Sequence, residues 1–196
     1  EVRQESWSRK FAGTGNLATA KPNIGHRALV ELFALEKCHG LITQNVDNLH
    51  QESGLPEERI VELHGNATYA TCLDCGKRYQ LNLIKKEFET DGSVLPCAAC
   101  GGIIKTATIS FGQTMPEVEM MRAAKMTKAC DLMIVLGSSL TVYPAAAFPE
   151  EVAASGKPVI IINREPTSLD NQALLRIGEG IGKTMSSVMD EIKALA

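Results

Sequence analysis

Apolar and polar positions along the chain predict strands and helices in alternation. Residues 131–137 (DLMIVLG) and 157–163 (KPVIIIN) are almost continuously apolar. Such runs are typical of strands in a parallel sheet that helices cover on both faces. Residues 41–44 and 59–65 predict two shorter strands, and the β-branched residues of 105–112 predict a further one.

Helical periodicity fills the segments between these strands. Residues 21–40 have proline and asparagine near one end, Gly40 at the other, and apolar residues at helical spacing between them. A proline in the first turn also opens the helix predicted for 116–130. Further helices are predicted at 46–54, at 144–156 with an interruption at Pro149, and at 184–196, whereas 1–20 is interpreted as a loop or a short irregular helix.

This alternation predicts an α/β fold with a Rossmann-like doubly wound parallel sheet. Residues 71–102 interrupt it and have little apolar periodicity of their own. We therefore predict a Rossmann-like domain made from residues 1–70 and 103–196, and a small insert made from residues 71–102. A chain of 196 residues suits one domain with such an insert.

The composition is that of an ordinary globular protein, with 44% hydrophobic and 22% charged residues. A net charge of −3 gives no basic field, and the charges within 71–102 balance, so we expect no direct nucleic-acid partner. No apolar run approaches the ~20 residues that cross a bilayer, and residues 1–10 lack a secretory pattern. We therefore expect a cytoplasmic protein without a membrane partner, whose oligomeric state the sequence leaves open.

Four of the six cysteines form two close pairs, Cys72 with Cys75 and Cys97 with Cys100. In a chain without a secretion signal, such pairs favour metal ligation over disulfides. Two C-x-x-C turns supply the four sulfur ligands of a structural zinc site, and they leave no position for a catalytic water. We predict one structural Zn2+ in a zinc ribbon at 71–102, where the metal supplies folding energy. A redox dithiol is the alternative.

Polar side chains follow two of the short predicted strands. Asn45 and Asp47 come directly after 41–44, and His64 lies at the end of 59–65. Because ligands of open α/β sheets bind outside the carboxyl ends of the strands, these side chains are candidates for a site. Histidine titrates near neutrality, so His64 is the candidate for acid–base chemistry. A histidine that only bonds the backbone at a strand end is an equally good interpretation.

Two later turns are candidates for contacts with a nucleotide. Gly137, Ser138 and Ser139 lie between a strand and a helix, an arrangement that can cradle phosphate. The segment 163–165, Asn-Arg-Glu, ends a later strand, where a polar side chain can bond a ribose hydroxyl. Turns of both kinds also occur without a ligand, and both interpretations stay open for each turn.

Taken together, these motifs resemble those of the sirtuin family, the NAD-dependent protein-lysine deacylases, and of its bacterial type. The similar segments run from about residue 20 to the end and are KPNIGHRAL (21–29), TQNVDNLH (43–50), LHG (63–65), the paired C-x-x-C, FG (111–112), GSSLTVYPAA (137–146) and INREPT (162–167). The resemblance implies an NAD-dependent deacetylase or deacylase that produces deacylated lysine, nicotinamide and O-acyl-ADP-ribose.

The resemblance also implies roles for single residues. His64 would be the general base, and Asn45 and Asp47 would complete the catalytic set. The cofactor-binding set would be Gln44, Asn45, Val46, Asp47, Gly137, Ser138, Ser139, Asn163, Arg164, Glu165 and Ile181. Phe111, Gly112, Val142 and Tyr143 would flank an acyl-lysine protein or peptide that is held as an extra strand.

The chain departs from the family pattern in three places. The family's glycine-rich GAGxS loop, the strand before it and the PDFR segment after it have no match. We therefore expect an N-terminal cofactor-loop segment to be missing and the NAD-binding domain to be incomplete at that end, so activity of this chain alone is not implied. The other departures are TATISFGQ for PDVVxFGE, with Gln113 replacing glutamate, and GSS for GTS.

Two other functions stay open on the sequence. One is mono-ADP-ribosyl transfer, which uses the same pocket with another nucleophile. The other is a non-catalytic module that binds a peptide or nucleotide and carries structural zinc. The presence of Asn45, Asp47 and His64 favours an enzyme over such a module.

Overall fold

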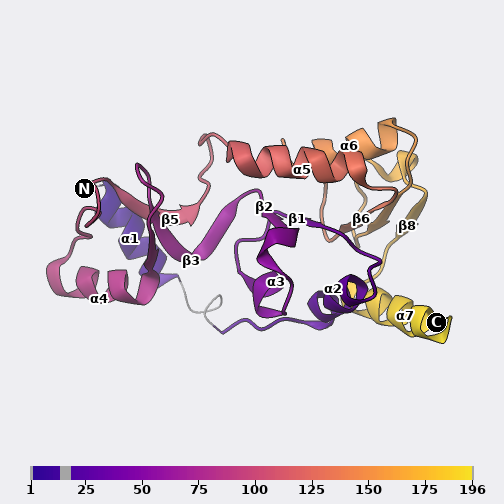
Figure 1. The fold of residues 1–196 in the computed structure, drawn as a ribbon, viewed down its shortest axis with the longest axis horizontal. Helices are drawn as coiled ribbons and strands as arrows, with labels where there is room; N and C mark the ends of the chain where they lie inside the picture. Colours follow the sequence, from indigo (N-terminus) through magenta and orange to yellow (C-terminus); the bar gives the residue numbers. More distant parts are fainter. Residues whose placement is uncertain (1, 14–18, 196) are drawn as a thin grey trace. The chain divides into compact units, whose positions relative to one another are not determined.

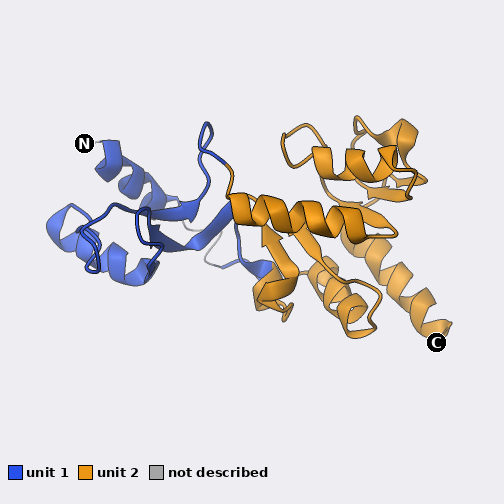
Figure 2. Cartoon of the chain, turned by 45° about the horizontal axis from the view of Figure 1, so that its top comes forward, with its two compact units in different colours: residues 1–21, 45–49, 64–114 blue, residues 22–44, 50–63, 115–196 orange. Residues whose placement is uncertain are grey.

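The computed structural model describes residues 2–13 and 19–195, and it contains two compact units. Unit 1 comprises residues 1–21, 45–49 and 64–114, and unit 2 comprises residues 22–44, 50–63 and 115–196 (Figure 2). Neither unit is one continuous stretch, because the chain crosses from one to the other several times. The predicted domain division, 1–70 with 103–196 and the insert 71–102, stays a prediction.

Unit 2 contains parallel strands and the helices that cover them. β1 (Leu41–Thr43) pairs with β2 (Ile60–Glu62), and Thr43 lies opposite Glu62. β7 (Val159–Ile162) lies between β6 (Met133–Leu136) and β8 (Leu175–Ile177), again in parallel. The helices are α2 (Ile24–Ala34), α5 (Glu117–Ala129), α6 (Ala147–Ala154) and α7 (Ile181–Ala194), with α3 (Leu49–Glu52) at the unit boundary and short 3-10 turns η1 (Glu57–Arg59) and η2 (Asp170–Gln172). The predicted α/β fold with parallel strands is confirmed.

Successive residues of the parallel strands enter cores on opposite faces, because side chains alternate along a strand. Ile60 of β2 packs into a cluster with α2 and α7, whereas Val61 packs into a cluster with α5 and α6. Ile162 of β7 joins the first face, and Ile161 joins a cluster that contains Val152 of α6. Figure 1 shows α2 and α7 on one side of the strands and α5 and α6 on the other. This burial on both faces explains the continuous apolar runs in the sequence.

Unit 1 is built on an antiparallel sheet with two helices. The elements are β3 (Gly65–Cys72) between β4 (Arg78–Gln80) and β5 (Ile104–Thr108), with α1 (Val2–Ala12) and α4 (Leu81–Asp91). Trp7 of α1 is 3% exposed, and its ring stacks on Phe11 with 5.4 Å between centroids. Phe11 in turn contacts Phe88 of α4 at 5.6 Å. Trp7 shares its buried cluster with Cys72 and Cys97, so the aromatic core adjoins the cysteine pairs.

The prediction of a loop or irregular helix at 1–20 is wrong for residues 2–12, which form the regular helix α1. Its buried face depends on two aromatic rings four positions apart rather than on a repeating apolar stripe, so periodicity did not reveal it. Residues 1 and 14–18 of that prediction lie outside the described residues.

Other elements differ from their predicted bounds. The helix predicted at 21–40 ends at Ala34, and Glu36 adopts a left-handed φ of 55°. Pro149 does not interrupt α6, because it is the third residue of the helix, where a backbone N–H has no partner within the helix. The strand predicted at 105–112 ends at Thr108 and is antiparallel to β3. The strand predicted at 59–65 ends at Glu62, and strands β3, β4 and β8 and helix α4 were not predicted.

Candidate functional site

The four paired cysteines converge in unit 1. Their sulfur atoms all lie within 4.8 Å of one another. The Sγ atoms of Cys72 and Cys100 are 3.5 Å apart, and those of Cys75 and Cys97 are 3.6 Å apart. Zn–S bonds of about 2.3 Å in a tetrahedron place sulfurs about 3.8 Å apart. The cluster therefore fits a four-thiolate zinc site, and these four residues are the ones that would hold the metal.

Backbone turns present the sulfurs to one point. Gly76 and Gly101 follow the second cysteine of each pair, and both have a left-handed φ, 71° and 76°. Gly76 N donates to the Cys72 carbonyl at 3.0 Å, and Gly101 N donates to the Cys97 carbonyl at 2.7 Å. A side chain at either glycine would strain this turn, because L-residues rarely adopt such a φ. The two cysteine pairs therefore lie in backbone turns of the same kind.

Tyr79 is a neighbour of the sulfur cluster that the sequence did not reveal. Its hydroxyl donates a hydrogen bond to Cys97 Sγ at 3.0 Å and accepts one from Ala98 N at 3.1 Å. This hydrogen bond lowers the pKa of Cys97 to about 6, because it stabilises the thiolate, and it raises the pKa of Tyr79 to about 12. A low thiol pKa favours the form that binds a metal.

His64 lies in the turn between β2 and β3, two residues beyond the end of β2, and it is half-buried. Its carbonyl accepts a hydrogen bond from Ile109 N at 2.9 Å. Gly65, which follows, has φ 69°, and a Cβ there would lie 1.9 Å from the Ala107 carbonyl oxygen. Only glycine fits so close to β5, so the backbone at His64 is fixed from the side of β5.

The segment 45–49 also belongs to unit 1 and lies beside the start of β3. Ala67 N donates to the Val46 carbonyl at 2.7 Å, which ties this segment to β3. The carboxylate of Asp47 accepts a hydrogen bond from Leu49 N at 3.0 Å, as at the start of a helix. Unit 1 therefore brings together three predicted residues, with Asn45 exposed and Asp47 and His64 half-buried.

Sequence reasoning missed two residues of this region, Asn48 and Asn66, whose side chains hydrogen-bond to each other at 2.9 Å. Asn48 has a left-handed φ of 66°, which is uncommon for a residue other than glycine and would have drawn attention to it. Asparagine is among the residues that tolerate this conformation best, but the sequence gives no sign of which asparagines adopt it.

Within unit 2, a second group of predicted residues meets at the carboxyl ends of parallel strands. Gln44 follows β1 and Ser138 follows β6, and Gln44 Nε2 lies 3.5 Å from Ser138 Oγ. Gly137 N donates to the Ile162 carbonyl at 2.9 Å, and Gly137 has φ 64°. A Cβ on Gly137 would lie 2.8 Å from Ile181 Cδ1. The start of α7 therefore lies against the turn after β6.

The turn after β7 completes this group. Asn163 N donates to the Ile177 carbonyl at 3.1 Å, and Asn163 Nδ2 donates to the Glu165 carbonyl at 2.7 Å. Arg176, which was not predicted, donates to the Arg164 carbonyl at 3.0 Å and forms a 3.2 Å ion pair with Asp170. The side chains of Ser139, Arg164 and Glu165 are exposed. The amides, hydroxyls and backbone groups here suit hydrogen bonds to a sugar and a phosphate.

The four residues predicted to bind a peptide fall in different units. Phe111 and Gly112 lie in unit 1 just after β5, and Phe111 is fully exposed. Val142 and Tyr143 lie in unit 2, and both are exposed, with the Tyr143 hydroxyl donating to the Glu150 carboxylate. Exposed aromatic and branched side chains beside a strand end are suited to contact an extended peptide.

Two further histidines are buried together in unit 2. The rings of His26 and His50 lie 4.7 Å apart between centroids, and both residues are less than 10% exposed. His26 also forms a capping box with Asn23 at the start of α2. These contacts give both residues a structural role.

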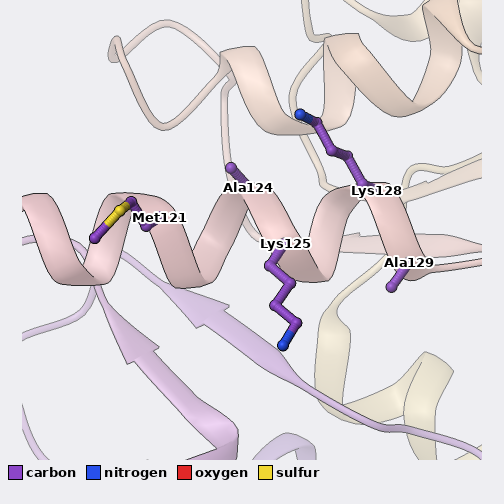
Figure 3. A pocket seen from close by; sticks show the side chains of 5 residues that line it. All are labelled: Met121, Ala124, Lys125, Lys128 and Ala129. Carbon is purple, nitrogen blue, oxygen red and sulfur yellow. The ribbon is translucent and has the colours of Figure 1, made fainter.

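An open depression of about 540 Å³ lies along one helix, α5 (Figure 3). Its lining is Met121, Ala124, Lys125, Lys128 and Ala129. None of the residues predicted for catalysis, cofactor binding or substrate binding is among them. The depression is therefore separate in its residues from the polar groups described above.

A family model described as the Sir2 family matches residues 1–144 of the chain. This match includes His64 and all four paired cysteines. It also includes residues 1–20, which the sequence motifs did not cover.

The chain is 52% identical to NAD-dependent protein deacetylase 1 of Bradyrhizobium diazoefficiens, over 94% of this chain and 72% of the relative. It is 49% identical to an NAD-dependent protein deacetylase of Rhodopseudomonas palustris, over 94% of this chain and 73% of the relative. Among solved structures, Sir2 with a p53 peptide and NAD+ superimposes with a TM-score of 0.88 at 33% identity, over 97% of this chain and 78% of that one.

Replacing one sulfur ligand tests the metal assignment. Cys97→Ser should lower the zinc content from about one ion per chain to nearly none, because a structural zinc site needs all four ligands. Elemental analysis of the purified protein measures this. Cys38→Ser and Cys130→Ser, outside the cluster, are controls that should keep the metal. A metal-free protein with unchanged stability would contradict a structural role.

The contact between Gly137 and Ile181 gives a stability prediction. Gly137→Ala should destabilise the protein by more than the ~1–3 kcal/mol of left-handed strain, because its Cβ also meets Ile181 Cδ1. Gly156→Ala is the matched control, since Gly156 has φ 76° but nothing within 4 Å of an added Cβ. Urea unfolding measures both. Adding Ile181→Val removes the Cδ1 atom and should bring Gly137→Ala close to the control; no recovery would exclude the clash.

Proposed function

The chain belongs to the Sir2 family and is an NAD-dependent protein deacetylase, and we propose that His64 is its general base. The assignment of this function rests on one observation, the Sir2 match over residues 1–144, which includes His64 and the cysteine cluster. The structures of Sir2 with a p53 peptide and NAD+ and of Sir2 bound to an acetylated peptide support an acyl-lysine protein or peptide as the substrate class. The products we propose are deacylated lysine, nicotinamide and O-acyl-ADP-ribose.

We propose that the unit 2 group binds the nucleotide part of NAD. Gly137 lets the backbone approach a ligand, and Ser138 and Ser139 offer donors to phosphate. Asn163, Arg164 and Glu165 face the adenosine ribose in this proposal, and Gln44 and Ile181 complete the set. When bound, NAD would supply a ribose carbon that the acyl oxygen of the substrate attacks, with nicotinamide as the leaving group. These residues would bind and orient it through hydrogen bonds.

We propose that unit 1 transfers a proton and orients the nicotinamide side of the cofactor and the peptide. Near neutral pH an imidazole can accept a proton, so His64 would take one from a ribose hydroxyl. Asn45, Val46 and Asp47 would hold the nicotinamide side of the cofactor. The hydrogen bond from Leu49 N fixes how the Asp47 carboxylate points. Phe111 and Gly112 of unit 1 would contact the peptide, and so would Val142 and Tyr143 of unit 2.

We propose the cytoplasm as the compartment. The four clustered cysteines must be reduced to bind zinc, and the cytosol keeps thiols reduced. In the described part of the chain, no helix has the length and the apolar character that spanning a membrane requires.

The reaction itself is tested by its dependence on NAD. We expect the full-length protein to remove acetyl groups from an acetyl-lysine peptide only when NAD is present, with one nicotinamide released per lysine deacetylated. Mass spectrometry of the peptide and chromatography of nicotinamide measure both. Equal deacetylation without NAD would overturn the function. An ADP-ribosylated peptide as the main product would support mono-ADP-ribosyl transfer instead.

The role of His64 is tested by substitution. His64→Ala should lower kcat by about 100- to 10,000-fold, the usual contribution of a general base. The zinc content should stay unchanged, since His64 is not among the sulfur ligands. His39→Ala is the control, because His39 is exposed and outside the proposed site. Unchanged turnover of His64→Ala would remove His64 from the base role.

A further inference from the structure

A pair of amide side chains in unit 1, with Asn66 buried and Asn48 half-buried, is not part of any role assigned above. Asn66 is 1% exposed, and its side chain makes at least three hydrogen bonds. Its Oδ1 accepts from Thr68 N at 2.9 Å and from Thr68 Oγ1 at 2.7 Å, and its Nδ2 donates to Asn48 Oδ1 at 2.9 Å. The two bonds from Thr68 orient the Asn66 amide, so its N–H points at Asn48.

Asn48 is the other member of the pair, and its backbone is unusual. It has φ 66°, a conformation that costs most non-glycine residues about 1–3 kcal/mol. Glycine would adopt it without strain, but glycine has no side chain to accept the bond from Asn66. Asparagine combines tolerance of this backbone with a side-chain acceptor. Asparagine at position 48 thus meets both requirements, the left-handed backbone and the side-chain acceptor.

The pair joins two segments that carry the proposed catalytic groups. Asn48 follows Asp47 directly, and Asn66 lies two residues after His64. A backbone bond from Ala67 N to the Val46 carbonyl, 2.7 Å long, ties the same segments at a second point. Lys10 Nζ of α1 donates to the Ala67 carbonyl at 2.8 Å. Two ties at neighbouring positions restrict sliding of one segment along the other.

We propose that Asn48 and Asn66 are positioning residues for the deacetylase reaction, which hold Asn45 and Asp47 in fixed register with His64. This inference rests on the proposed roles of those three residues. Asn66 is buried, so loss of this bond should cost more than loss of a bond on the surface. The pair acts through the backbone of its neighbours and does not itself touch the reacting atoms.

The chemistry of amides allows a test that barely changes shape. Asn48→Asp keeps an acceptor for the Asn66 N–H. Asn66→Asp keeps the acceptor for Thr68, and the Asn48 amide can turn over to donate its own N–H. When both positions carry Asp, two acceptors face each other and the bond is lost. Each single variant should therefore keep kcat within about threefold of the parent, whereas the double variant should lose at least about tenfold.

The experiment measures kcat and KM for NAD and for an acetyl-lysine peptide in the full-length protein and these three variants. A matched control is the double variant Asn82→Asp with Asn171→Asp, which adds the same charge at two exposed positions. Zinc content reports whether unit 1 is folded, since the sulfur cluster belongs to the same unit. We expect a fall in kcat for the Asn48–Asn66 double variant alone, with zinc retained.

Equal kcat for the double variant and the control would overturn the inference. If the double variant loses zinc, the positioning role is tested with Asn48→Gly instead. Glycine keeps the backbone conformation at position 48 and removes only the side-chain acceptor. We expect a fall in kcat of about three- to tenfold for that variant, and parental kcat would again overturn the inference.

Amide hydrogen exchange separates this inference from the proposed function. Exchange at Leu49 and Ala67 should rise about tenfold in the double variant, whether or not the parent deacetylates peptides. If the parent is inactive but exchange rises in the double variant, the proposed function is contradicted, while the link between the two segments is supported. An active parent without the rise would contradict the tie.

Discussion

The parallel pairing of β1 and β2 places Thr43 opposite Glu62, and the segments that contain the candidate catalytic residues follow these two strands directly in the chain. The pairing continues past the strands, with Leu63 N donating to the Thr43 carbonyl at 3.0 Å in unit 2. In unit 1 the bond from Ala67 N to the Val46 carbonyl keeps the same two segments side by side. Because side chains alternate along a strand, a slip of one residue in β2 would turn Ile60 and Val61 toward the wrong clusters.

The eight residues of β3 connect the histidine turn to the sulfur cluster. Gly65 at one end fits against the Ala107 carbonyl, and Cys72 at the other end is one of the four sulfur ligands. A metal that holds Cys72 also holds the sheet in which β3 is the central strand. The aromatic core from α1 and α4 supports the same sheet, with Trp7 buried beside Cys72. The structural zinc site therefore stabilises the strand that presents His64.

In the proposed function unit 2 binds the nucleotide part of NAD, and a nucleotide needs many weak hydrogen-bond donors at one edge. The carboxyl ends of parallel strands supply them, since all of these strands end on the same side. The close contact of Gly137 with Ile181 and the bonds around Asn163 fix the backbone there. Burial of β7 on both faces, through Ile161 and Ile162, keeps this edge rigid.

The sequence by itself determined the features that depend on local spacing. Apolar runs predicted the parallel strands, and two C-x-x-C pairs predicted the cysteine cluster, because a strand period and a ligand turn are readable within a few residues. The order of motifs predicted the Sir2 family. The roles of His64, Asn45 and Asp47 stay predictions, supported by their place in one unit.

Only the tertiary structure decided which distant residues meet. It showed α1 as part of the core beside the cysteines, since Trp7 and Phe88 are far apart in the chain. It also placed Tyr79 on Cys97 and paired Asn48 with Asn66. Hydrogen bonds between residues 18 positions apart leave no periodic pattern, because long-range packing rather than local propensity selects the partner.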